Sequence, residues 1–269
     1  MRQEFKSNRP KKSLGQSFLK DKRIIDRIIG ACSISVGDAV LEIGPGHGEL
    51  TRRLISQAGR VSAVELDTGL YRMLKESLGS CENLELINKD ILKFDIGRHF
   101  KGQDTKIRVI GNIPYYITSP IIEHLFSCRG MIKDIFLTVQ KEFARRLVSP
   151  PGSREYGSFS CFAQYYSSPE ILFYIKRGSF SPAPKVDSAF LRLKIRNEPP
   201  VKVSDEELFF KIIRTAFSQR RKKLSNSIKN IASWPQLELF FSRYGIDNRA
   251  RPEVLSLQDF ANLANIINA

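Results

Sequence analysis

The sequence lacks the features that would send a protein across a membrane or hold it there. No apolar run approaches the roughly 18–20 residues that a membrane-spanning helix needs. The opening MRQEFKSNRPKK leads into no hydrophobic stretch of the kind found in secretion signals. We therefore expect a soluble, cytoplasmic protein with no membrane partner.

Cysteine and histidine are also scarce, and they are scattered. The chain has four cysteines and three histidines, with no CxxC pair among them. A disulfide framework or a structural zinc site needs closely spaced cysteines and histidines, so both are disfavoured. We expect no metal and four buried, reduced thiols, at Cys32, Cys81, Cys128 and Cys161.

Acidic residues are in deficit. The chain carries 43 Lys and Arg against 28 Asp and Glu, which gives a net charge of +15. The excess is densest in the first 30 residues and in the run Arg220, Arg221, Lys222 and Lys223. Solvated surface charge alone is a poor explanation for so large an excess. A polyanionic partner is indicated, either nucleic acid or an anionic membrane surface, and we favour nucleic acid.

In the first half of the chain, short apolar segments alternate with helical patterns. Such regular alternation predicts an α/β protein whose parallel sheet is covered on both faces. The expected strands are 39–43, 60–65, 84–87, 107–110 and 134–139, and the expected helices are 21–31, 49–57, 69–78 and a helix that begins over 120–126.

The pattern changes after about residue 140. Two further strands are expected over 170–175 and 189–195, on either side of a proline-containing loop. The prolines within 197–200 indicate a linker, because they interrupt regular structure. Ser204, followed by three acidic residues, is typical of a helix N-cap, and the rest of the chain reads as helical. We therefore predict two domains, 1–200 and 201–269.

A glycine-rich loop, EIGPGHG, follows the first strand of the alternating region. Its spacing is GxGxG rather than the GxGxxG of dinucleotide-binding proteins, and the next helix begins later. Three interpretations remain open: a simple turn, a dinucleotide site, or a site for the methionyl part of S-adenosylmethionine. The spacing favours the third, with Gly44 close to the ligand.

Two acidic residues follow the next two strands. Glu65 closes one strand in VELD, and Asp90 follows the next in NKD. Each alone is most simply a turn-forming residue. Together they lie at the carboxyl ends of successive parallel strands, where ligands bind. There Glu65 could accept hydrogen bonds from ribose hydroxyls, and Asp90 from an adenine amino group.

The fourth strand ends in Gly-Asn-Ile-Pro-Tyr-Tyr. Asn112 offers an amide oxygen, and Pro114 leaves the carbonyl of Ile113 free. Two acceptors on one exocyclic amine would direct its lone pair at an electrophilic methyl group, while Tyr115 offers a flat face to the base. The alternative is an Asn-Pro turn with core tyrosines. The position after a glycine loop and two strand-end acids favours the first interpretation.

These motifs occur together in a known family. GQSFL, EIGPGHG, VELD, NKD, NIPYY and FSPAPKVDS have the order and spacing of the KsgA/RsmA-type small-subunit rRNA adenine N(6),N(6)-dimethyltransferases, which the sequence resembles from about residue 11 to 268. The related Erm enzymes share several of them. The resemblance implies a class I, Rossmann-like methyltransferase fold with a mostly parallel sheet and a small helical C-terminal domain.

The resemblance also implies an activity. The enzyme would transfer methyl groups from S-adenosylmethionine to two adjacent adenosines near the 3′ end of 16S rRNA, giving dimethyladenosines during small-subunit ribosome biogenesis. Its partner would be the immature 30S particle, and nothing demands more than a monomer. Two alternatives remain: an Erm-type enzyme acting on large-subunit rRNA, and a non-catalytic rRNA-binding assembly factor.

Specific roles follow by matching motif positions. The donor contacts would be Ser17, Leu19, Gly44, Glu65, Asp90 and Asn112, and the catalytic residues Asn112, Pro114, Tyr115 and Phe180. Ser17 departs from the usual Asn or His, so its contact would be made by the backbone or through water. Phe180 would hold the target base against Tyr115, unless it is a core residue beneath a surface loop. Arg220, Arg221, Lys222 and Lys223 would bind rRNA phosphates.

Overall fold

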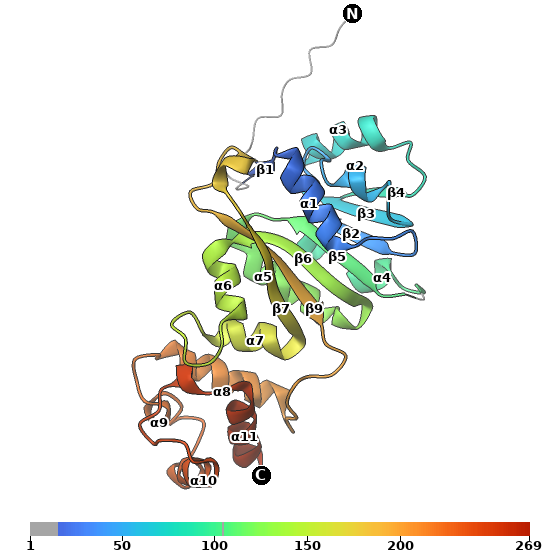
Figure 1. Ribbon diagram of the computed structural model, residues 1–269. Coiled ribbons are helices and arrows are strands. Elements are labelled where there is room, and N and C mark those ends of the chain that lie inside the picture. The colour runs from blue at the N-terminus through green and yellow to red at the C-terminus, as the bar shows by residue number, and fades with distance from the viewer. Residues whose placement is uncertain (1–15, 104) are drawn as a thin grey trace, which may run out of the picture. The chain divides into compact units, whose positions relative to one another are not determined.

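The computed structural model describes residues 16–103 and 105–269 (Figure 1). Residues 1–15, with most of the basic N-terminal arm and the first residue of GQSFL, lie outside this part. The chain forms two compact units. The sheet unit comprises the described residues up to Ala144 together with Glu170–Ile195, and the helical unit comprises Arg145–Pro169 and Arg196–Ala269. Residues 145–169 thus pack with the helical unit, whereas the sequence predicted a boundary at residue 200.

A seven-stranded sheet runs through the sheet unit in the order β4-β3-β2-β5-β6-β9-β7. The first five strands in this order are parallel, and β9 is antiparallel to β6. The predicted mostly parallel sheet is therefore confirmed. The strands are β2 (Ala39–Ile43), β3 (Arg60–Glu65), β4 (Leu84–Asn88), β5 (Ile107–Asn112), β6 (Ile132–Gln140), β7 (Ser167–Ile175) and β9 (Ser188–Ile195).

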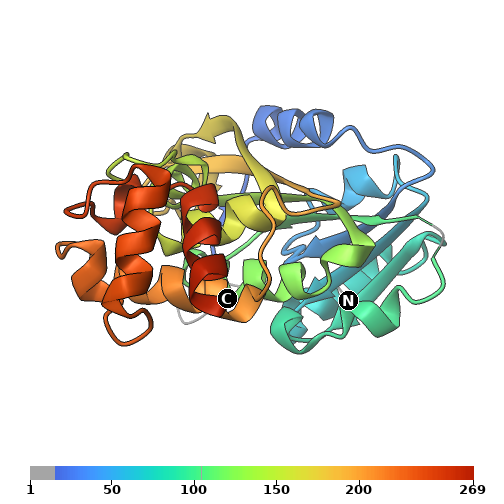
Figure 2. The same ribbon diagram turned by 90° about the horizontal axis from the view of Figure 1, so that it is seen from below.

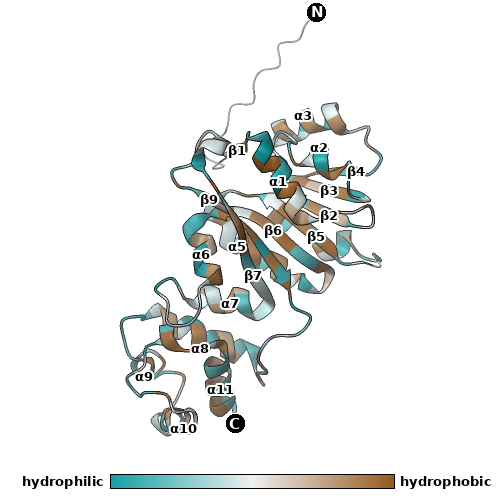
Figure 3. Cartoon of the chain, in the orientation of Figure 1, coloured by the Kyte–Doolittle hydropathy of each residue, from teal (hydrophilic) through white to brown (hydrophobic). Residues whose placement is uncertain are grey.

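Helices cover both faces of this sheet, α1 on one face and α5 on the other (Figures 1 and 2). Helix α1 begins after Asp21, whose carboxylate accepts a hydrogen bond from the Arg23 amide. Its isoleucines pack with Val40 and Val61 in a buried core, and the strands beneath are largely hydrophobic (Figure 3). The helices are α1 (Lys22–Cys32), α2 (Thr51–Leu54), α3 (Thr68–Leu78), α4 (Ile96–His99), α5 (Thr118–Ser127) and α6 (Lys141–Val148).

A second, two-stranded sheet joins distant parts of the sequence. Strand β1 (Phe18–Leu19) pairs antiparallel with β8 (Phe180–Ser181), so that Leu19 faces Phe180. Both side chains are buried in the same hydrophobic core as the isoleucines of α1. This pairing fixes the segment before α1 beside the loop that leads into β9.

The helical unit contains five whole α-helices among its described residues, together with the second half of α6. They are α7 (Ser158–Tyr166), α8 (Glu206–Ser218), α9 (Leu224–Ser227), α10 (Trp234–Tyr244) and α11 (Leu257–Asn268). The N-cap of α8 is Asp205, whose carboxylate accepts from the Leu208 amide, and the prediction of Ser204 was wrong by one residue. The Ser204 hydroxyl instead donates to Asn265 at the far end of α11, so it ties two helices together.

The cysteines are free thiols, as predicted, but only Cys32 and Cys161 are buried. Burial raises the pKa of both thiols to about 12, so they are protonated at neutral pH. Cys81 and Cys128 are partly exposed, which corrects the expectation of four buried thiols. No helix in the described part of the chain is long and apolar enough to cross a membrane.

Candidate active site

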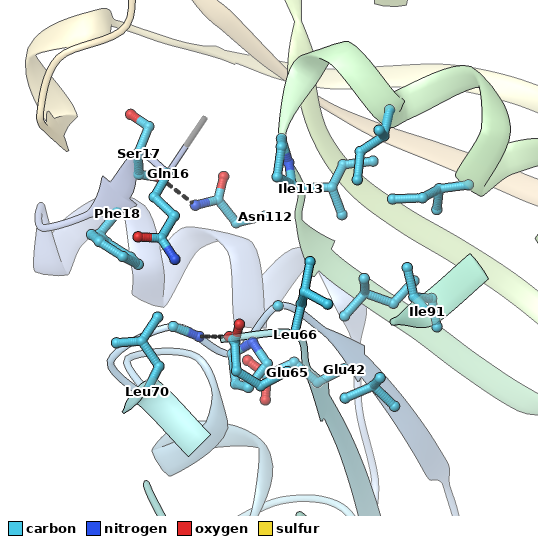
Figure 4. Close-up of a pocket in the computed structure, with 18 of the residues that line it drawn as sticks. Gln16, Ser17, Phe18, Glu42, Glu65, Leu66, Leu70, Ile91, Asn112 and Ile113 are labelled. Atoms are coloured by element: carbon cyan, nitrogen blue, oxygen red, sulfur yellow. Dashed lines mark hydrogen bonds between the residues drawn. The ribbon is translucent and has the colours of Figure 1, made fainter. Parts of the chain in front are cut away.

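The sheet topology creates a crevice beside β2. Strand β3 lies on one side of β2 and β5 on the other, so the chain leaves the carboxyl ends of these strands in opposite directions. Ligands bind at such switch points of parallel sheets. A cavity of about 190 Å³ lies there, lined by residues that follow β2, β3, β4 and β5 and by residues of β1 (Figure 4). We call it the donor pocket.

The glycine loop forms one wall of the donor pocket. Gly44 and Gly46 have φ angles of +66° and +60°, which residues with a side chain rarely adopt. A Cβ atom on Gly46 would also lie 2.9 Å from the ring of Phe18. The backbone amide of Gly46 donates to Oε2 of Glu65 at 3.1 Å. Glycine at position 46 therefore permits both the turn and the close approach of β1.

The two predicted strand-end acids both line the donor pocket. Glu65 is 6% exposed, and its second oxygen accepts from the Asp67 amide at 2.8 Å. Burial raises its pKa, and these backbone donors oppose the rise. One oxygen of Asp90 accepts from the Leu92 amide at 3.0 Å, so Asp90 also starts a short 3-10 helix. The sequence analysis left two alternatives for these acids, a turn-forming role and a place in a ligand pocket. In the structure each acid does both.

Asn112 is held in a defined orientation at the end of β5. Its Nδ2 donates to the backbone carbonyl of Ser17 at 2.9 Å (Figure 4). The Ser17 hydroxyl donates in turn to the carbonyl of Pro182 at 2.7 Å. Because Nδ2 is engaged by Ser17, Oδ1 is the acceptor that Asn112 offers to a ligand. Ser17 thus acts here through its backbone carbonyl, while its side chain fixes the loop after β8.

Tyr115 lines the donor pocket, and its hydroxyl lies 2.5 Å from the Oγ atom of Ser188. Ser188 is fully buried at the start of β9, so it anchors one end of the Tyr115 ring. Pro114 lines the same wall, and Tyr116 beside it is 62% exposed. The sequence analysis did not single out Ser188, although it closes the FSPAPKVDS motif.

The structure places Phe180 differently from the prediction. Its side chain is 1% exposed in the hydrophobic core and is not among the residues lining the donor pocket. The pairing of Phe180 with Leu19 places it there. From the same loop it is Pro184 that reaches the pocket wall. The predicted sandwich of a base between Tyr115 and Phe180 is therefore not present in this conformation.

One pocket residue was missed by the sequence analysis. Glu42, the glutamate of EIGPGHG, lines the donor pocket and is 1% exposed. Its Oε2 atom has no hydrogen-bond partner among the described residues. Burial is the main cause that raises its pKa to about 8; the nearby Thr51 hydroxyl opposes the rise, and the neighbouring Glu65 carboxylate adds to it. The sequence does contain a signal for this residue, because Glu42 is an acidic residue within the otherwise apolar strand predicted over 39–43.

A second candidate site lies within the helical unit. A groove after α8 is lined by six cationic side chains and by no carboxylate: Arg221, Lys222, Lys223, Lys229, Arg249 and Arg251, with Gln219 and Asn226 between them. We call it the basic groove. The Leu224 amide donates to the Ala250 carbonyl at 2.8 Å and so joins its two halves. The cations near residue 250 were not predicted, because they lie in an ordinary-looking loop.

Arg220 differs from the other three residues of its run. Its guanidinium donates to the backbone carbonyls of Arg154 and Tyr156 at 3.0 and 2.8 Å. It does not line the basic groove. These contacts give Arg220 a structural role within the helical unit, where it holds residues 145–169; its predicted contact with rRNA phosphate stays a prediction.

Comparisons with known proteins agree with this geometry. Residues 7–269 match the family model for ribosomal RNA adenine dimethylase. A protein of Caldanaerobacter subterraneus subsp. tengcongensis called ribosomal RNA small subunit methyltransferase A is 42% identical over 96% of this chain and 97% of its own length. A protein of the same name from Moorella thermoacetica is 38% identical over 96% and 92%.

Two solved structures share the fold at 27% identity. The first is a dimethyladenosine transferase from Plasmodium falciparum, with a TM-score of 0.78; the match covers 91% of this chain and 95% of that chain. The second is the 23S rRNA methyltransferase ErmE, with a TM-score of 0.73; the match covers 94% of this chain and 100% of that chain. The predicted class I methyltransferase fold is confirmed. The chain belongs to the ribosomal RNA adenine dimethylase family.

Proposed function

We propose that this protein transfers methyl groups from S-adenosylmethionine to two adjacent adenosines near the 3′ end of small-subunit rRNA and leaves both as dimethyladenosines. The observation that carries the proposal is the orientation of Asn112. Its amide oxygen is offered at a pocket whose glycine loop and strand-end acids suit a nucleoside. Relatives that are called ribosomal RNA small subunit methyltransferase A are about 40% identical over nearly the whole chain, which supports the small-subunit substrate.

The residues of the donor pocket fit the chemistry of S-adenosylmethionine. Glu65 keeps free lone pairs on both carboxylate oxygens for ribose hydroxyls. Asp90 can receive the adenine amine with its second oxygen, and the loop at Gly44 admits the methionyl tail. Ser17 and Leu19 complete the wall from β1. The bound donor supplies an electrophilic methyl group.

The target adenine would be oriented by the wall at the end of β5. Oδ1 of Asn112 and the carbonyl of Ile113 accept the two hydrogens of the exocyclic amine and direct its lone pair toward the methyl group. Pro114 keeps that turn rigid, and Tyr115 offers its ring to the base. Holding both reactants in this geometry supplies much of the rate. The amine loses its proton after the nitrogen becomes cationic, so the wall needs no strong base.

The basic groove is suited to the rRNA backbone. Phosphate contacts set the position of a protein on a nucleic acid without reading its sequence. Six cations with no carboxylate in the lining suit that task, and immature small-subunit particles are the source of such RNA. We assign phosphate binding to Arg221, Lys222 and Lys223 and to the additional cations of the groove.

The number of methyl groups is the decisive test. After one transfer the amine keeps one hydrogen, so one of the two acceptors is left to water, and the first methyl must turn away from the donor. We expect monomethyladenosine to appear transiently and dimethyladenosine to accumulate. Mass spectrometry of digested rRNA over a time course measures both.

The same experiment separates the alternatives. Immature small-subunit particles and naked large-subunit RNA are incubated in parallel with excess donor. Dimethylation of the small-subunit RNA supports the proposal. Preferential methylation of the large-subunit RNA identifies an Erm-type enzyme, and binding without methylation identifies a non-catalytic assembly factor. A plateau at monomethyladenosine with donor in excess contradicts a dimethyltransferase.

A further inference from the structure

The aromatic rings that line the donor pocket are not equally engaged by the protein. Phe18 packs edge-on against the imidazole of His47, with the ring centroids 4.2 Å apart. The Tyr115 hydroxyl lies 2.5 Å from the Oγ atom of Ser188. Tyr116 also lines the pocket, but it is 62% exposed, and its side chain has no aromatic or hydrogen-bond partner among the described residues. Tyr116 therefore presents its ring to solvent at the mouth of the pocket.

The backbone that carries Tyr116 is held firmly. Tyr116 lies in a short 3-10 helix that runs directly into α5. The Ile117 amide donates to the Pro114 carbonyl at 3.3 Å. The hydroxyl of Thr118, a residue that is 2% exposed, donates to the Tyr115 carbonyl at 3.1 Å. A tyrosine side chain has only two χ angles, so a ring on a fixed backbone loses little conformational entropy when a partner stacks on it.

The position of Tyr116 decides which part of the substrate can reach it. Leu66, a second exposed hydrophobic residue of the lining, is 50% exposed and follows Glu65 on the donor side. Tyr116 instead follows Tyr115, to which we assign the target base. The Cα atoms of consecutive residues are about 3.8 Å apart, so a group that stacks on Tyr116 lies directly beside the target base. In RNA, that group is the base of the adjoining nucleotide.

We propose that Tyr116 stacks on the base next to the target, which in a pair of adjacent adenosines is the other adenosine of the pair. The inference rests on the proposed function, because it takes that pair as the substrate. A base must leave its stack before its amine reaches the donor, and its departure exposes one face of the neighbouring base. The Tyr116 ring covers that face. Because stacking uses only the π-face of a base, the contact also tolerates a neighbour that already carries methyl groups.

The first experiment changes the ring. Loss of one base–aromatic stack weakens binding by about 5-fold to 150-fold, so we expect Tyr116→Ala to lower kcat/KM for immature small-subunit particles by at least about fivefold. Tyr116→Phe keeps the ring and should stay within about twofold of the parent protein. Tyr174→Ala is the matched control and should have the kcat/KM of the parent. Tyr174 is 45% exposed in the same sheet unit and does not line the donor pocket.

The second experiment removes the neighbouring base instead of the ring. The 3′ segment of the rRNA is supplied as a synthetic oligonucleotide, ligated to the rest and reconstituted into particles. In two such substrates, one or the other adenosine of the pair is replaced by an abasic residue, and methyl transfer to the remaining adenosine is measured. If the ring and the missing base stack on each other, Tyr116→Ala costs nothing further on these substrates, and the variant and the parent protein are equally fast.

Several outcomes overturn the inference. They are a parental kcat/KM in Tyr116→Ala, an equal loss in Tyr116→Phe or Tyr174→Ala, and an effect of Tyr116→Ala that persists on both abasic substrates. Calorimetric titration with S-adenosylhomocysteine should give Tyr116→Ala the affinity of the parent, which also shows that the variant is folded. A matching loss there would make Tyr116 a donor contact and overturn the inference as well. If the parent protein methylates no small-subunit substrate, the proposed function itself fails.

Discussion

The donor pocket and the basic groove are built from different kinds of polar group. In the pocket, the polar groups are fixed by hydrogen bonds: Glu65 by two backbone amides, Asn112 by Ser17, and Tyr115 by Ser188. In the groove, the polar groups are mainly long cationic side chains on loops and short helices. Fixed polar groups suit the orientation of a small ligand, and a cluster of cations suits a polyanion. Substitutions in the two regions should therefore affect different measurements.

The largest effect is expected at Asn112. Asn112→Ala removes one acceptor for the target amine, a loss that costs about 10²–10³-fold in kcat when such a group acts in the transition state. The measurement is single-turnover methyl transfer at saturating donor. Unchanged thermal unfolding serves as the control, and a rate within a few-fold of the parent would exclude Asn112 from the chemistry.

The next largest effect is expected on the affinity for the donor alone. Glu65→Ala removes the acceptor for the ribose hydroxyls, and we expect donor affinity to fall by about 5–150-fold, which corresponds to about 1–3 kcal/mol. The affinity for rRNA should not change, because the basic groove lies in the other unit. Calorimetric titration measures the first quantity. Glu76→Ala on the exposed face of α3 is the control, and equal donor affinity in the two variants removes Glu65 from the site.

The basic groove should respond through salt dependence. Replacing Arg221, Lys222 and Lys223 by Gln should reduce the slope of log affinity for rRNA against log salt by up to about 0.9 per lost phosphate contact. Donor affinity should stay as in the parent. The matched control removes three exposed lysines of the sheet unit, Lys75, Lys101 and Lys133. A parental slope in the groove variant would show that this cluster is ordinary surface charge.

A smaller effect, on stability rather than on rRNA binding, is expected at Arg220. Because its guanidinium holds the carbonyls of Arg154 and Tyr156, Arg220→Gln should lower the stability of the helical unit by about 1–3 kcal/mol. The salt slope should be that of the parent. Chemical denaturation measures the stability, and rRNA titrations at several salt concentrations measure the slope. A reduced slope with unchanged stability would restore Arg220 to the phosphate-binding residues.

The smallest effect is expected at Ser188, which acts through Tyr115. Ser188→Ala should lower kcat by about threefold to tenfold, since a single hydrogen bond contributes about 1 kcal/mol, while donor affinity is retained. Tyr115→Phe keeps the ring but loses the same bond. If Ser188 serves to orient the ring, the double variant should be no worse than either single one. Additive losses would assign the two residues separate roles.

The sequence predicted the donor side of the fold well because its signals are local. Residues 39–43 and 60–65 form strands with the predicted bounds, and Glu65 and Asp90 line the pocket as expected. Parallel strands place their carboxyl ends together, so local patterns were enough to bring these acids to one edge. The helix predicted over 49–57 is only the short α2, since turns occupy the rest.

The features that the sequence did not predict depend on distant partners. Phe180 reads as an exposed loop aromatic until its pairing with Leu19 draws it into the core. The structural role of Arg220 depends on carbonyls 64 and 66 residues away along the chain. Residues 145–169 read as part of the first domain because they precede its last strands, but they pack with helices that follow residue 200. No local pattern contains this information.

The bond between Asn112 and Ser17 has a consequence for how the family can vary. Asn112, whose side chain we propose presents an acceptor to the adenine, is held by the backbone carbonyl of Ser17, and the Ser17 hydroxyl donates to the Pro182 carbonyl in the loop before β9. A change in this loop can therefore shift the Asn112 amide without touching it. Selection for a different RNA can act on a peripheral turn and alter the speed of the chemistry, while the residues around the reacting atoms stay the same.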